Sequence, residues 1–451
     1  MTVESEASYI FQGKVSKKPL MCVGGDGMYI TIEDPVTKEK KVVLDALSDS
    51  DPEIVEAMKE AAEKSVYTFG SYFANYAAEE LGKFICDRSH GAFTSALFTG
   101  SGSEANENAL KIMKQYHIEN GEPQRYKFIS RHQSYHGYTI GALSIGEGPR
   151  KVPFRDILLS DDQTPKVSQC YPYRNKLEGE SDEDYGKRLV QELEDVFIRE
   201  GTDKVAGVIM ETVGGSTFGT SPPVPGYLDG VKAVCEKYGA LFMLDEVMCG
   251  MGRCGSYMTW DQFMTNGGPD IQSVGKTIGS GFVTLAGLLI SPKIKNVYDA
   301  GSGFIAGAQT YHSHQFNCLV GLAVQKKIMR DNLVENIKET GTYMAEQLKI
   351  ALKDSKIAGD VRGCGSFWSV ELVKDKATKE PFDPKLDVCH LVQDQAYENG
   401  ITLMGGSGTI DGKIGDHVTV GPSYIMTKAE ADIIVKALSG AILSVEKKLF
   451  A

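Results

Sequence analysis

The sequence predicts an α/β protein in which a large domain, built on a mostly parallel sheet flanked by helices, is joined to a smaller α+β domain. Two patterns favour this class: short apolar segments alternate with longer amphipathic ones in the middle of the chain, and strand-rich segments recur at both ends. The length of 451 residues also exceeds what one hydrophobic core ordinarily holds. We therefore expect residues 1–62 and 313–451 to form the small domain and residues 63–312 to form the large one.

The strands of the large domain are predicted from five apolar segments. These segments are 126–130, 205–210, 240–244, 270–274 and 285–290. Each of them except the last ends at a polar or glycine-containing cluster, and open α/β sheets bind their ligands at such strand ends. Amphipathic helices are predicted between the strands, one beginning near Ser103 and another after Gly226.

The small domain is predicted from both ends of the chain. Residues 27–47 are rich in strand-forming side chains, and residues 361–373 have the pattern of a strand pair. Thr427 and Glu430 have the spacing of a capping box, which predicts the start of a final helix. Because both ends carry such segments, we expect them to fold together beside the large domain.

Charge and cysteine content exclude several classes of function. A net charge of -12 and a pI near 5.3 argue against a nucleic-acid partner, because phosphate backbones are bound by clustered Lys and Arg. The nine cysteines form no CxxC pair, which is typical of reduced thiols and predicts no metal site. The first residues lack the basic and apolar regions of a signal peptide, and no apolar run is long enough to span a bilayer. We expect a cytoplasmic protein whose partners are small molecules or a second copy of itself.

Asp245 directly follows the apolar segment 240–244, where a partly buried carboxylate needs a partner. One interpretation is that it faces the cationic ring nitrogen of a bound group. The other is that it caps a helix or forms an ion pair at the strand end. The residue alone does not decide between these interpretations.

Lys276 follows the segment 270–274 and is surrounded by glycines, among them Gly275 and Gly279. A lysine that is desolvated at a strand end has a lowered pKa and acts as an amine nucleophile. The alternative is a surface lysine in a glycine loop. The interpretation of Lys276 as an amine nucleophile is favoured by its combination with Asp245, because an isolated acid and an isolated lysine follow successive predicted strands.

The segment GSGSEANENALK (100–111) predicts an anion site at a helix N-terminus. The free backbone N–H groups of Gly102 and Ser103, together with the helix dipole, suit a phosphate group. The alternative is that Ser103 merely caps the helix.

Tyr135, in the segment SYHGYT, lies just beyond a predicted strand and can stack flat on a planar ring. A buried core tyrosine is the alternative. His136 and Gly137 are interpreted as turn residues, and His312 and His314 as part of a loop rather than a pair of metal ligands.

A phosphate site, a stacking ring, a carboxylate for a ring nitrogen and a lysine for an aldehyde together describe pyridoxal 5'-phosphate (PLP). The ordered motifs SGSEANENALK, YHGYT, PPVPGY, LDEVMCGMGR, GKTIGSG and TYHSH resemble those of the class III (ω-type) aminotransferases. The resemblance extends from about residue 24 to the C-terminus. It implies the type I fold of PLP-dependent transferases, with a seven-stranded-type sheet, and transaminase activity.

The resemblance also implies roles for the residues around the cofactor ring. Lys276 would form the Schiff base with the cofactor and act as the catalytic base. Asp245 would pair with the pyridine nitrogen. Tyr135 would stack on one face of the ring, and Val247 would contact the other.

Further roles implied by the resemblance concern the phosphate and the substrate. Gly102, Ser103 and Thr310 of the partner subunit would hold the phosphate, and Glu211 would lie near the substrate. Such enzymes work as homodimers whose sites lie at the interface.

Two departures from the family pattern bear on the substrate. Residues 42–58 pass almost directly from strand to helix, where the family usually has a glycine-rich loop. No arginine follows Arg362, although many relatives bind the substrate carboxylate with an arginine of the C-terminal domain. Lys413 is the one cation in the matching segment MGGSGTIDGKIGDH, and its alternative interpretation is a solvent-exposed loop residue.

Three hypotheses about function follow. The first is a transaminase that moves an amino group from an amine or ω-amino acid to a 2-oxo acid such as pyruvate. The second is a PLP-dependent epimerase or decarboxylase on the same fold, and the third is a non-catalytic relative. Under the first, the missing arginine predicts donors without an α-carboxylate, since an unpaired buried carboxylate loses several kcal/mol.

Overall fold

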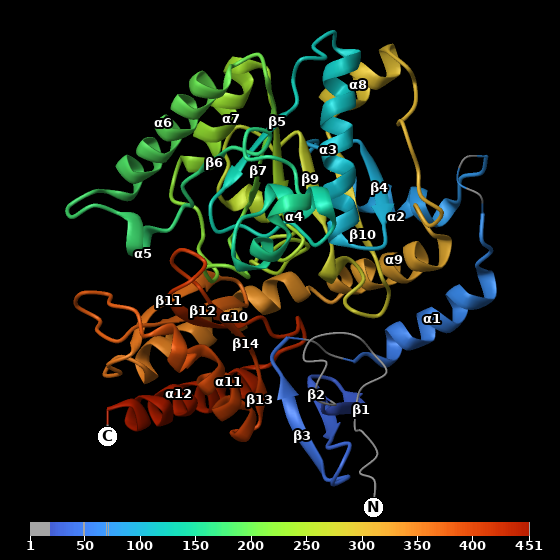
Figure 1. The fold of residues 1–451 in the computed structure, drawn as a ribbon. Coiled ribbons are helices and arrows are strands. Elements are labelled where there is room, and N and C mark those ends of the chain that lie inside the picture. The colour runs from blue at the N-terminus through green and yellow to red at the C-terminus, as the bar shows by residue number, and fades with distance from the viewer. Residues whose placement is uncertain (1–18, 48–49, 69, 71, 451) are drawn as a thin grey trace, which may run out of the picture.

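A seven-stranded sheet forms the centre of the molecule in the computed structural model, which describes residues 19–47, 50–68, 70 and 72–450 (Figure 1). The strand order is β4-β10-β9-β8-β7-β5-β6, and β10 runs antiparallel to both of its neighbours while the other pairs are parallel. The strands are Ser95–Thr99 (β4), Lys127–Arg131 (β5), Lys166–Val167 (β6), Val205–Glu211 (β7), Leu241–Asp245 (β8), Ile271–Val274 (β9) and Ala286–Ile290 (β10). The five predicted strands and the mostly parallel sheet are confirmed.

Helices cover both faces of this sheet, as the side chains of β8 demonstrate. Phe242 and Leu244 belong to a core cluster that includes residues of α6 and α7, whereas Leu241 and Met243 belong to a cluster with α3. Successive side chains of a strand point to opposite faces, so burial on both faces produces the continuous apolar segment seen in the sequence. The helices of this part are Tyr76–Cys86 (α2), Gly102–Glu119 (α3), Ile140–Ile145 (α4), Pro172–Asn175 (α5), Asp182–Glu200 (α6), Tyr227–Tyr238 (α7) and Pro292–Ala300 (α8). Four short 3-10 helices are Pro149–Ile157 (η1), Thr259–Gln262 (η2), Lys276–Ile278 (η3) and Pro384–Leu386 (η4).

The two ends of the chain pack together below the large sheet (Figure 1). One four-stranded sheet joins Met21–Asp26 (β1), Tyr29–Glu33 (β2) and Lys40–Asp45 (β3) to Ile401–Thr402 (β13). The other contains Ala358–Cys364 (β11), Phe367–Leu372 (β12), Met404–Ser407 (β14) and Asp416–Val420 (β15). The surrounding helices are Pro52–Lys64 (α1), Gln315–Arg330 (α9), Leu333–Ala351 (α10), Val388–Glu398 (α11) and Lys428–Leu449 (α12). The strand pair and the capping box of Thr427 and Glu430 are confirmed, while the domain boundaries at residues 62 and 312 stay predictions.

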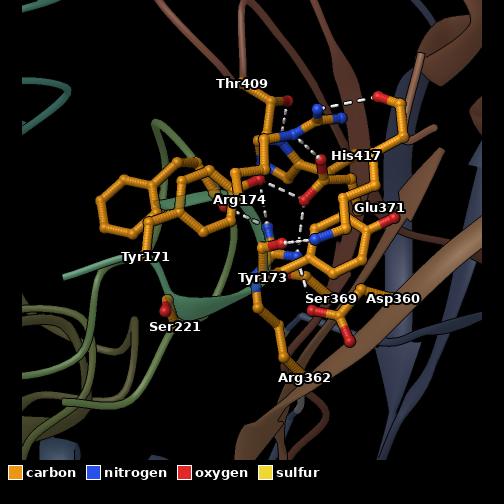
Figure 2. Close-up of polar contacts among 12 residues, drawn as sticks. Tyr171, Tyr173, Arg174, Ser221, Asp360, Arg362, Ser369, Glu371, Thr409 and His417 are labelled. Atoms are coloured by element: carbon orange, nitrogen blue, oxygen red, sulfur yellow. Dashed lines mark hydrogen bonds and ion pairs between the residues drawn. The ribbon is translucent and has the colours of Figure 1, made fainter. Parts of the chain in front are cut away.

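A buried polar cluster joins the C-terminal sheet to the large sheet's side of the molecule (Figure 2). Arg362 on β11 donates hydrogen bonds to Glu371 on β12 at 2.7 Å and to Asp360 at 3.0 Å. Glu371 also accepts hydrogen bonds from Arg174 of α5, at 2.5 Å, and from the hydroxyl of Tyr171. Because Glu371 is fully buried, its charge depends on these arginines. Arg362, the last arginine of the sequence, is therefore bonded within a cluster that links the C-terminal sheet to the part of the molecule built on the large sheet.

Candidate active site

The predicted site residues gather at the carboxyl edge of the central sheet. Asp245 is the last residue of β8, Glu211 is the last residue of β7, and the two are paired neighbours in the strand register. Lys276 follows β9, and Tyr135 follows β5. Parallel strands bring their ends to one edge, which explains why residues far apart in the sequence meet there.

One pocket of about 290 Å³ contains every predicted site residue except Thr310. The predicted residues that line it are Gly102, Ser103, Tyr135, Glu211, Asp245, Val247 and Lys276. Thr310 is exposed in a turn and does not line this pocket of its own chain. Lys413 is an exposed loop residue, in agreement with the second interpretation of it.

Asp245 is buried and accepts three hydrogen bonds. The Nδ1 atom of His136 lies 2.9 Å and the Nδ2 atom of Asn106 lies 2.8 Å from Asp245 Oδ2, while the backbone N–H of Val247 donates to Oδ1 at 3.0 Å. Burial acts to raise the pKa of Asp245, but the hydrogen bond and charge of His136 outweigh it and the pKa is lowered. The site therefore contains a carboxylate that stays ionised although it is buried.

Lys276 presents its amine to the same pocket from a strained backbone. Its φ of 43° lies in the left-handed region, which a residue other than glycine adopts only where the surrounding structure enforces it. Desolvation by the surrounding protein lowers the pKa of Lys276, and the negative charge of Asp245 offsets part of this effect. A larger fraction of neutral amine at physiological pH follows, as a nucleophile or base requires.

The N-terminus of α3 forms one end of the pocket. Ser101 is the N-cap and accepts the N–H of Glu104 at 3.2 Å, so Ser103 lies in the first turn and does not cap the helix. Gly102 lies against Val247, since a Cβ atom on Gly102 would lie 2.8 Å from Val247 Cγ1. The first-turn N–H groups of a helix have no intrahelical acceptor and point at the pocket, as an anion site requires.

Ser103 also orders the loop that carries Tyr135. Its hydroxyl accepts the N–H of Tyr138 at 2.9 Å, and a Cβ atom on Gly137, whose φ is 140°, would lie 2.7 Å from Ser103 Oγ. The half-buried ring of Tyr135 is thereby held beside the helix N-terminus.

Glu211 contacts an arginine of the neighbouring strand β5. Arg131 of β5 donates to the Glu211 carbonyl at 2.7 Å and reaches the carboxylate at 3.5 Å. Burial raises the pKa of Glu211. Arg131 is itself 2% exposed and lines neither this pocket nor the adjoining one described below, so it does not face a substrate.

Sequence reasoning missed two members of the site, His136 and Asn106. His136 lies in a loop as expected of a turn residue, but its ring is buried against Asp245. Asn106 follows Ser103 by nearly one helical turn, a spacing that was a usable signal for a residue on the pocket side of α3. Asn106 Oδ1 and His136 Nε2 are buried and have no hydrogen-bond partner within the described residues.

Two further expectations concern segments outside the pocket. Ser48 and Asp49, at the centre of the shortened segment 42–58, lie outside the described residues. In the described part of the chain, no helix combines the length and the apolar character needed to cross a membrane.

A sheet of this topology with a lysine, a buried carboxylate and a helix N-terminus at one pocket defines a PLP-dependent transferase of the α/β type. Residues 46–442 match the family model "Aminotransferase class-III", and the chain belongs to this family. An uncharacterized aminotransferase of Schizosaccharomyces pombe is 40% identical over 446 residues, covering 97% of this chain and 95% of that protein. Gamma aminobutyrate transaminase 2 of Solanum lycopersicum is 31% identical over 417 residues, covering 89% of this chain and 86% of that protein.

Solved structures give the same result for the fold. The omega transaminase from Pseudomonas jessenii in complex with PMP matches with a TM-score of 0.87 and 27% identity, covering 96% of this chain and 94% of that one. The (S)-enantioselective omega-transaminase from Thermomicrobium roseum matches with a TM-score of 0.86 and 30% identity, covering 95% and 93%. The chain is thus a PLP-dependent transaminase of fold type I.

The residues present fit this cofactor. The first turn of α3 offers N–H groups to a phosphate, and the half-buried ring of Tyr135 offers a stacking surface. Asp245 would offer an ionised carboxylate to a protonated ring nitrogen, and the amine of Lys276 lies in the same pocket.

Proposed function

We propose that this enzyme transfers an amino group from an amine or an ω-amino acid to a 2-oxo acid such as pyruvate. The supporting observation is that the Lys276 amine and the Asp245 carboxylate share one pocket, with the pKa of both groups lowered. An amine that is readily neutral can both hold the cofactor and move a proton. A carboxylate that stays ionised can keep the ring nitrogen of the cofactor protonated.

The roles of the residues follow from these positions. Bound PLP supplies a ring that withdraws electrons from the carbon next to the substrate nitrogen. Lys276 would hold the cofactor through its Nζ atom, and its free amine would move the proton of the reacting carbon. Asp245 would pair with the ring nitrogen, and Tyr135 and Val247 would enclose the ring. Because the proton transfer needs a neutral amine, the rate should rise with pH through the lowered pKa of Lys276.

We further propose a homodimer in which Thr310 of the partner subunit completes the phosphate site formed by Gly102 and Ser103. Support comes from the exposure of Thr310, which leaves it accessible to a second copy of the chain. We also propose a cytosolic location, because all nine cysteines are free thiols and reducing compartments keep thiols in that state.

The test is a half-reaction with cofactor-loaded enzyme and one donor at a time. Amines and ω-amino acids should convert the cofactor to its amine form, and added pyruvate should restore the aldehyde form. Simple α-amino acids should be poor donors. Product without any amine form would favour an epimerase or decarboxylase, and absence of both would contradict catalysis.

A further inference from the structure

Arg150 differs from every other described arginine because it has neither a hydrogen bond nor an ion pair. The other ten each donate at least one hydrogen bond to a carboxylate, hydroxyl or carbonyl oxygen; they are Arg88, Arg125, Arg131, Arg155, Arg174, Arg188, Arg199, Arg253, Arg330 and Arg362. The one contact recorded for the Arg150 guanidinium is with the Tyr135 ring, whose centroid lies 4.7 Å from it. An arginine stacked on an aromatic ring keeps its five N–H donors free for a planar anion.

The backbone around Arg150 is fixed although its side chain has no polar partner. Arg150 is the second residue of η1, after the cap residue Gly148 and Pro149. Within the same helix, Lys151 Nζ donates to the carbonyl of Ser144 at 3.0 Å, and Arg155 donates to Glu147 at 2.7 Å. Arg150 is therefore held at a defined place beside Tyr135.

Arg150 lines a second pocket, of about 240 Å³, that adjoins the first. The two pockets share four lining residues, namely Tyr135, His136, Gly137 and Ser216. The opposite wall is β14, where Gly405 and Gly406 present backbone without side chains. A substrate that reacts in the first pocket can thus extend past Tyr135 into a space that contains the Arg150 charge.

None of the acidic side chains that line this pocket neutralises the positive charge of Arg150. Glu147 is the one acidic residue lining it, and Glu147 is already paired with Arg155 at 2.7 Å and with Lys151 at 3.5 Å. Desolvation is the main cause of the lowered pKa of Lys276, and the positive charge of Arg150 contributes in the same direction. The two cations therefore act within one electrostatic environment.

The C-terminal part of the chain offers no competing arginine. Arg362 is buried in the cluster of Figure 2, bonded to Glu371 and Asp360. Lys413 is exposed and lines neither pocket. Arg150, on the large sheet's side of the second pocket, can therefore take the place of the missing C-terminal arginine as partner of a substrate carboxylate.

We propose that Arg150 binds the carboxylate of an ω-amino acid donor, which is several bonds away from the reacting amine. This proposal rests on the proposed function and narrows the donors from amines in general to ω-amino acids. It also accounts for poor use of α-amino acids, whose carboxylate lies next to the reacting carbon and not beyond Tyr135.

The test compares 5-aminopentanoate with pentylamine, which differ by the carboxylate, in single-turnover half-reactions of the cofactor-loaded enzyme. Arg150→Met should lower kcat/KM for 5-aminopentanoate about 10- to 100-fold and leave that for pentylamine within about twofold, since a charge-assisted hydrogen bond contributes on this scale. Arg150→Lys should fall between, because a lysine lacks the planar fork. Arg199→Met is the matched control and should preserve the preference for 5-aminopentanoate, because the exposed Arg199 pairs with Glu200 and lines neither pocket.

A binding measurement separates this proposal from the proposed function. Calorimetry with pentanoate, which has no amine to react, should give a dissociation constant raised about 10-fold or more in Arg150→Met and unchanged in Arg199→Met. Unchanged pentanoate affinity in Arg150→Met, or equal losses with 5-aminopentanoate and pentylamine, would overturn the role of Arg150. Failure of the wild-type enzyme to convert the cofactor with either donor would instead overturn the proposed function, and with it the substrate assignment made here.

Discussion

Replacing Asp245 with asparagine removes one charge and changes one acceptor into a donor at the base of the pocket. The carboxylate accepts hydrogen bonds at both oxygens, from His136 and Asn106 at Oδ2 and from the Val247 N–H at Oδ1. An amide has one oxygen, so in either orientation its NH2 group faces an N–H donor. The variant keeps the shape of the site but cannot keep all of its hydrogen bonds.

Two magnitudes follow from this geometry. A buried donor left without an acceptor costs about 1–3 kcal/mol, which should appear as a lower free energy of unfolding for Asp245→Asn. Loss of a preorganised charge facing the cofactor ring should cost a further 3–4 kcal/mol or so in the transition state, which is about 10²- to 10³-fold in the half-reaction rate. The rate loss is the larger effect because the charge acts in a buried site.

Urea unfolding and single-turnover spectroscopy of the cofactor-loaded variant measure the two effects separately. Asp87→Asn is the control, because Asp87 forms an ion pair with Lys83 at 2.8 Å between two exposed side chains and lies outside the pocket. That control should change stability by less than about 1 kcal/mol and leave the rate unaffected. A half-reaction rate of Asp245→Asn within about threefold of wild type would refute the assigned role of the carboxylate, since threefold is under 1 kcal/mol.

Three other predictions test the lysine, the buried cluster and a buried histidine. Lys276→Ala should abolish the covalent retention of cofactor after borohydride reduction, as read from the intact mass, whereas reduced cofactor on another lysine would contradict the assignment. Glu371→Gln should lower the free energy of unfolding in urea by about 3–5 kcal/mol, because two arginines lose a buried counter-charge. A loss below about 1 kcal/mol, the scale of a surface ion pair, would contradict this reasoning. Burial lowers the pKa of His417 from 6.5 to about 3. The unfolded chain therefore binds a proton at this histidine more tightly than the folded chain does. The stability contributed by neutral His417 is present above pH 6.5 and is lost as the pH falls toward 3. At about pH 5 the loss should be about 2 kcal/mol, and His417→Gln should flatten the dependence of unfolding free energy on pH, which an unchanged slope would contradict.

The sequence predicted the sheet because strands that are buried on both faces are apolar at successive positions, and such segments are recognisable in the sequence. The segment that became β8 is apolar throughout and ends at Asp245, so the strand and its terminal acid were both readable. Lys276 was found in the same way, after β9, whereas Glu211, at the end of β7, was named only through the family resemblance. Parallel pairing then brings such ends together without further information.

What the sequence did not predict depends on contacts across the fold. His136 and Asp245 are 109 residues apart, and a single histidine in a polar loop carries no local sign of its partner. Two serines stand near the start of α3, and the helix begins so that Ser101 is its cap and Ser103 lies in its first turn. Arg150 lies in a 3-10 segment without hydrophobic periodicity, so its place beside Tyr135 was invisible until the loop was positioned.

The parallel pairing of β3 with β13 has a consequence for how the chain is made. Leu44 pairs with Ile401, and Asp45 accepts a hydrogen bond from Thr402, 357 residues later. At ribosomal speeds of about 5–20 residues per second, β3 waits on the order of 20–70 s before its partner strand is synthesised. During that interval one edge of the first sheet has no strand beside it, and a long loop must close before pairing can occur. Strand β3 therefore gains its second neighbour only after β13 has been made, so a nascent chain halted before residue 401 leaves the edge of β3 open to proteases and chaperones.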